Sequence, residues 1–169
     1  MRIARCPAVL AVVDALAEPT IRKRRRWIRR FAHHWRILRE YYSGERHASD
    51  SGIYKDDIAQ FFLKCAHFRD QLIHDSAVAV PDATILGFFW NSDPLSLSGD
   101  FADTWKHHTR TPRSGRLPRS VRIGSVSSTF RATVVWREPT TNVQHSRDVL
   151  VLVEQAVDEW RRFLQLHQL

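Results

Sequence analysis

Large apolar side chains recur every three or four residues through three long segments, and this periodicity constrains the fold more than any other feature. The segments are 21–42, 54–75 and 148–166. The spacing places the apolar side chains along one face of a helix, and that face must be buried against another element. The apolar positions are Ile28, Phe31, Trp35, Leu38 and Tyr42 in the first segment, Ile58, Phe61, Phe62, Cys65, Phe68 and Leu72 in the second, and Val149, Leu152, Val153, Ala156, Trp160, Phe163 and Leu164 in the third. We therefore expect a helical bundle.

Shorter segments add to these three helices. Residues 7–17 predict a short helix, and residues 95–108 predict a further one that follows a turn sequence, Asn91-Ser92-Asp93-Pro94. Pro81 stops any continuation of the helix before it. The apolar run over residues 85–90 is typical of either a strand or a buried loop.

A β element is expected before the last helix. Residues 122–136 are rich in Val, Thr, Ser and Phe with partial alternation, which indicates a β-hairpin or two short strands within a β insertion over 120–144. The predicted fold class is therefore mainly α, a helical bundle with a small β-hairpin inserted before the last helix. We expect one domain over residues 1–169, with an N-terminal helix or arm over 1–20.

The charge balance points to a polyanionic partner. The chain has 26 Lys and Arg residues against 18 Asp and Glu residues, a net charge of +8 and a pI of about 10.3. Such an excess favours RNA or DNA, ahead of an anionic membrane. The alternative is a genome that prefers arginine codons, in which case the excess carries no functional meaning.

Cysteine usage and the N-terminus indicate the compartment. Cys6 and Cys65 lie far apart with no metal-ligand spacing, which fits a reducing environment, and Cys65 reads as a small core residue. Asp14 interrupts an apolar run that is short for a signal peptide. No run reaches the roughly 18 apolar residues that a membrane span needs. We expect a cytoplasmic protein without a transmembrane segment, and no metal or other cofactor.

The stretch His67-Phe68-Arg69-Asp70-Gln71-Leu72-Ile73-His74 closes the most apolar predicted helix. An Arg, a polar residue directly after it and a His five positions beyond the Arg form an R-x4-H pattern. Arg29–His34 and Arg162–His167 match the spacing too, but at Arg69 the polar Asp70 follows directly. This motif resembles the signature of the HEPN superfamily, whose members are small helical bundles and often metal-independent RNases.

The resemblance implies attack by a ribose 2′-OH on the adjacent phosphate. Arg69 would neutralise charge that develops on the phosphate oxygens, and His74 would transfer protons. Asp70 and His74 lie four residues apart and share a helix face, so Asp70 could hold the imidazole. Arg69 and His74 are separated by roughly 140° on an ideal helix, so convergence would need the reach of the Arg side chain, a fraying last turn or a second subunit. The predicted catalytic residues are Arg69, Asp70 and His74.

Two other readings of the same stretch stay open. Arg69, Asp70 and His74 could form a structural cluster of salt bridges at a helix end. His67, Asp70 and His74 could instead form a metal triad, because their spacing places them on one face. However, His67 and His74 lie about 10.5 Å apart along the helix axis, too far for both to reach one ion without a break in the helix.

Three groups of basic residues are candidate nucleic-acid contacts. Arg24, Arg25 and Arg29 lie in an Arg-rich run interleaved with aromatic residues, which could contact a phosphate backbone or, less favourably, a membrane surface. The other two groups are Lys106 with His107, at the end of a predicted helix, and Arg110 with Arg113, in a loop. All of these residues could equally be solvated surface.

Together these features predict a metal-independent endoribonuclease of the HEPN type, which could act as a toxin or phage-defence effector. The resemblance implies a homodimer, and a toxin would have an antitoxin protein as a partner. The alternatives are a non-catalytic HEPN-like module that binds nucleic acid or nucleotides, and a basic protein-interaction domain.

Overall fold

The computed structural model describes residues 22–47, 50–106 and 117–169. Five helices and three strands are found there. The helices are α2 (Arg22–Ser43), α3 (Ser51–His74), α4 (Asp82–Asn91), α5 (Asp93–Lys106) and α6 (Val149–Leu166). The strands are β1 (Ser120–Val126), β2 (Ala132–Arg137) and β3 (Gln144–Asp148). The predicted fold class, a mainly α bundle with a small β element before the last helix, is confirmed, whereas the predicted helix over 7–17 lies outside the described residues.

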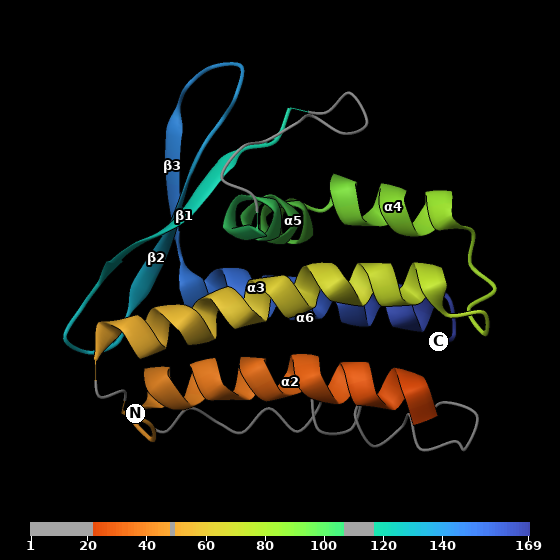
Figure 1. Ribbon diagram of the computed structural model, residues 1–169, viewed down its shortest axis with the longest axis horizontal. Coiled ribbons are helices and arrows are strands. Elements are labelled where there is room, and N and C mark those ends of the chain that lie inside the picture. Colours follow the sequence, from red (N-terminus) through yellow and green to blue (C-terminus); the bar gives the residue numbers. More distant parts are fainter. Residues whose placement is uncertain (1–21, 48–49, 107–116) are drawn as a thin grey trace.

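The bundle is built around α3, which α2 and α6 accompany on one side and α4 and α5 cover on the other (Figure 1). The fully buried aromatic side chains come from α3, α4 and α6, and they include Phe61, Phe62, Phe89, Trp160 and Phe163. Trp160 contacts Phe68 edge to face, with 4.9 Å between ring centroids. The apolar stripes read from the sequence are therefore the faces that meet in the core.

Cys65 is a core residue, as predicted. It is fully buried, and Trp160 Nε1 donates a hydrogen bond to its Sγ at 3.3 Å. Burial raises the pKa of the Cys65 thiol to about 11, so the thiol stays protonated at neutral pH.

Aspartates begin two of the long helices. Asp50 accepts hydrogen bonds from the backbone N–H groups of Gly52 at 2.6 Å and Ile53 at 3.0 Å, and thereby caps α3. Asp148 caps α6 in the same way. The Tyr42 hydroxyl donates to Asp148 Oδ1 at 3.1 Å, which ties the end of α2 to the start of α6.

The expectation of a strand or loop over residues 85–90 was wrong, because these residues lie within α4. Ile85 and Phe89 are four residues apart and both fully buried, so they face the core from one side of a helix. Pro81 and Asp82 suit the start of a helix, since proline fixes a compatible backbone angle and an acidic residue is favourable in the first turn. The run was simply too short for its periodicity to distinguish a helix from a strand.

The predicted hairpin is present, but it is part of a larger, three-stranded antiparallel sheet in the order β1-β2-β3. Val121 pairs with Trp136 and Ile123 with Val134, and the register then shifts before Val126. The third strand was not predicted. Because of it, the β region ends at Asp148 and not at residue 144 as predicted. Its sequence, Gln-His-Ser-Arg-Asp, has no apolar residue, so no strand pattern marks it.

Candidate functional site

The guanidinium of Arg69 is held in one orientation near the C-terminal end of α3. Its Nη2 and Nε lie 2.6 and 2.8 Å from Asp70 Oδ1. On its other side the guanidinium carbon lies 4.6 Å from the ring centroid of Phe89 and 5.4 Å from that of Trp90. These aromatic residues come from α4, so the packing of α4 on α3 positions the arginine.

The Arg69 side chain keeps a path to solvent. Its relative exposure is 18%, and that of Asp70 is 39%. Arg69 Nη1 carries two N–H donors with no acceptor among the described residues, since the ion pair to Asp70 uses Nε and Nη2. One edge of the guanidinium is therefore fixed, and the other can donate to an anion.

The structure pairs Asp70 with Arg69, and not with His74 as the sequence spacing suggested. His74 is the last residue of α3 and is exposed. Within the described part of the chain its imidazole forms no hydrogen bond or ion pair. The adjacent arginine outcompetes the histidine because its fork of donors can contact one carboxylate oxygen twice. Arg69, Asp70 and His74 thus lie at one helix end without forming a hydrogen-bonded triad.

A metal site is not supported in this region. Among the residues that the structure describes, no three or more His, Cys, Asp or Glu side chains are grouped so that they could hold a metal ion. His67, Asp70 and His74 lie on an unbroken helix, so the axial separation of the two histidines stands.

The structure describes only some of the predicted nucleic-acid contacts. Arg29 is exposed on α2. Arg24 and Arg25 lie in the first turns of α2, and Lys106 is the last residue of α5, but their side chains are outside the described part. The remaining candidates, His107, Arg110 and Arg113, lie outside the described residues altogether.

His34 of α2 lies near Lys64 and Asp57 of α3. Burial lowers the pKa of His34, and the nearby His33 and Lys64 lower it further. Asp57 acts in the opposite direction with a smaller effect. His34 is therefore neutral at physiological pH.

Sequence reasoning missed a buried arginine cluster between α5 and the sheet. The side chain of Arg119 is 9% exposed and that of Asp100 is completely buried. Arg119 donates from Nε to Asp100 Oδ2 at 2.9 Å, from Nη1 to Asp93 Oδ1 at 2.8 Å and from Nη2 to Ser96 Oγ at 2.6 Å. Arg119 ends the basic stretch of sequence that also holds the candidate contacts Arg110 and Arg113. Its donors are instead committed to α5, so this arginine serves the fold.

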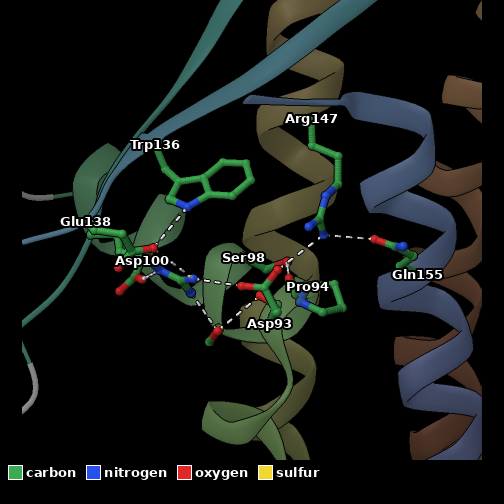
Figure 2. A network of polar contacts seen from close by, with 10 residues as sticks. Asp93, Pro94, Ser98, Asp100, Trp136, Glu138, Arg147 and Gln155 are labelled. Carbon is green, nitrogen blue, oxygen red and sulfur yellow. Dashed lines mark hydrogen bonds and ion pairs between the residues drawn. The ribbon is translucent and has the colours of Figure 1, made fainter. Parts of the chain in front are cut away.

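The cluster continues into the last strand and α6. Arg147 Nη1 lies 3.2 Å from Asp93 Oδ2 and 3.0 Å from Gln155 Oε1, as Figure 2 shows. Trp136 Nε1 donates to Glu138 Oε1 at 3.2 Å. The one signal of this network in the sequence is a set of polar residues in α5, Ser96, Ser98 and Asp100, that lie among apolar neighbours and are buried in the structure.

Comparisons with protein-family models, with curated proteins and with solved structures find no match for this chain. No helix in the described ranges is both long and apolar enough to cross a membrane.

Proposed function

We propose that this protein is a metal-independent endoribonuclease of the HEPN type, with its site at the C-terminal end of α3. The observation that carries the proposal is the Arg69 guanidinium, fixed on one edge by Asp70 and on its face by Phe89 and Trp90, with Nη1 left to donate. A cation held in this way is prepared for a phosphate oxygen before the substrate arrives, and such preorganisation is a large part of catalysis.

The reaction is transfer of the phosphate from the 5′-oxygen of the next nucleotide to the 2′-oxygen of the ribose. The 2′-OH loses its proton to a base, the 2′-oxygen attacks phosphorus, and the 5′-oxygen leaves as it gains a proton. The products are a 2′,3′-cyclic phosphate and a 5′-OH. No atom changes its oxidation state, so the reaction needs no oxidant or reductant. His74 is exposed on the turn after Arg69 and is the group that transfers a proton.

A single histidine supplies one of the two proton transfers. The second comes from water or from His74 of a second copy of the chain, and this fits the homodimer that the HEPN resemblance implies. We place the enzyme in the cytoplasm, acting on RNA as a toxin or defence effector whose activity an antitoxin protein holds in check. The net charge of +8 supports attraction to RNA.

The test is RNA cleavage in EDTA by the wild-type protein and by His74→Ala. We expect wild type alone to cleave total tRNA and mRNA and to leave 2′,3′-cyclic phosphate ends. Loss of a proton-transfer group lowers the rate by about 100- to 10,000-fold. His145→Ala is the matched control, because His145 is exposed on β3 and belongs to another part of the fold. Equal cleavage by wild type and His74→Ala would remove His74 from the site.

A non-catalytic RNA-binding module is the second candidate, favoured because Asp70 pairs with Arg69 and leaves the His74 imidazole without a carboxylate to orient it. In that case Arg69→Ala weakens RNA binding, and neither wild type nor any variant cleaves. A basic protein-interaction domain, the third possibility, would bind its partner equally well in the presence of excess RNA. Thermal unfolding of each variant shows whether it is folded.

A further inference from the structure

The three-stranded sheet has one face against the bundle and one face open. Val121, Val134 and Trp136 are buried and point toward the helices. Because successive side chains alternate between the faces, their neighbours point outward. The outer sheet face, as we call it, consists of two rows across the strands, Arg122–Val135–Ser146 and Ser120–Arg137–Gln144.

Two arginines of the outer sheet face are open to solvent. Arg122 on β1 and Arg137 on β2 are both exposed. The Arg122 side chain has no hydrogen bond or ion pair to any described residue, and Arg137 Nη1 donates to the side-chain oxygen of Asn142 at 3.3 Å. Arg122 pairs with Val135, so Arg137 is its diagonal neighbour, about 7–8 Å away along the sheet. The two guanidinium groups can therefore contact one extended anionic chain.

No acidic residue opposes these arginines in either row. Glu138 follows Arg137, but it lies toward the inner face, where it accepts from Trp136 Nε1 and lies 4.0 Å from Arg119. Asp148, at the end of β3, is engaged as the cap of α6. The carboxylates closest in sequence are committed elsewhere, so the outer sheet face is positive.

At Gly124 the outer sheet face has no room for a further side chain. A Cβ on Gly124 would lie 2.5 Å from Thr133 Oγ1 and 3.0 Å from Val135 Cγ2, so only glycine fits between β1 and β2 at this point. Half-buried Val135 is the single apolar side chain of the two rows. The remaining members carry hydroxyl, amide or guanidinium groups.

We propose that the outer sheet face binds the phosphate backbone of single-stranded RNA. Its arginine forks suit phosphate oxygens, and its hydroxyl and amide groups suit riboses. A membrane is disfavoured because the face has no large apolar side chain to insert. An acidic protein segment is disfavoured because Val135 is the one apolar side chain of the two rows that its apolar residues could contact. The sheet and the C-terminal end of α3 lie at opposite ends of the helix in Figure 1, so this site goes beyond the proposed nuclease site and does not depend on cleavage.

The test is the affinity for a fluorescein-labelled 20-nucleotide single-stranded RNA, measured by fluorescence anisotropy over a salt series. All variants are made in the His74→Ala background, so that the RNA stays intact. The test variant is Arg122→Ala/Arg137→Ala. The control, Arg161→Ala/Arg162→Ala, removes the same charge from α6, where the two arginines pair with acidic residues three positions before them. Thermal unfolding verifies the fold of both.

We expect the test variant to lose affinity by about tenfold or more at low salt, while the control changes little. The slope of log K against log salt should fall by about 1.4, since each phosphate contact on a single strand contributes about 0.7. Equal losses in test and control would overturn the proposal, because only net charge would matter. No loss in the test variant would overturn it as well. Unchanged RNA affinity with lost binding to polyglutamate or to phosphatidylserine vesicles would assign the face to an acidic protein or a membrane instead.

Discussion

Replacing Arg119 with alanine is expected to destabilise the protein by about 3–5 kcal/mol. The substitution removes three hydrogen bonds from the buried cluster, to Asp100, Asp93 and Ser96. The largest contribution comes from Asp100, whose side chain is completely buried and loses the cation beside it. Removing one partner of a buried ion pair costs several kcal/mol, because the remaining charged group has been taken out of water.

Arg147→Ala provides a matched control for the same network. Arg147 also contacts Asp93, but the two side chains are 33% and 49% exposed. Solvent screens this pair, so its loss should cost no more than about 1 kcal/mol. The double variant Asp100→Leu/Arg119→Met removes both buried charges of this ion pair and should therefore be more stable than Arg119→Ala.

The assay is urea unfolding followed by circular dichroism at 222 nm, with the free energy of unfolding extrapolated to water. A loss below about 1 kcal/mol for Arg119→Ala, similar to that of Arg147→Ala, would refute the argument from burial. A double variant no more stable than Arg119→Ala would refute the argument from the uncompensated carboxylate.

Two further predictions concern stability. Tyr42→Phe should lower the free energy of unfolding by about 1–2 kcal/mol, because the Tyr42 hydroxyl donates to Asp148 and accepts from Leu150 N. Tyr54→Phe should lower it little, because the buried Tyr54 hydroxyl has no hydrogen-bond partner among the described residues. Urea unfolding of both variants tests this difference, and equal losses of stability would contradict it. The lowered pKa of His34 means that the unfolded chain binds a proton more readily than the folded protein, so stability is full above pH 6.5 and falls as the pH drops through the folded pKa. His34→Gln should reduce this loss between pH 7 and pH 5, and an unchanged pH profile of unfolding would contradict that assignment.

Much of the helical architecture was predictable because it follows from local periodicity. In α3 the apolar positions from Ile58 to Leu72 all proved to be buried. In contrast, α4 was too short for its pattern to be read. The strand β3 is formed by pairing with β2, as in the pair Val134 and Arg147, and not by any preference of its own residues.

The candidate site divides in the same way. The proximity of Arg69 and Asp70 follows from their adjacency, but the support from Phe89 and Trp90 requires the turn between α3 and α4 to bring the helices together. Arg119 joins residues 19 and 26 positions before it, and nothing in the local sequence of a basic loop distinguishes the one arginine that will be buried. Contacts of this kind depend on the completed fold.

The carboxylate of Asp93 has a consequence for how the chain can vary. One of its oxygens contacts Arg119, just before β1, and the other contacts Arg147, in β3 just before α6 begins. Both ends of the three-stranded insertion thus form ion pairs with a single residue of the bundle. Residues added to or removed from the turns between the strands would leave these two ion pairs and the Asp148 cap in place. The insertion can therefore change in length or sequence as a replaceable part, while the helices that carry Arg69 and His74 keep their arrangement.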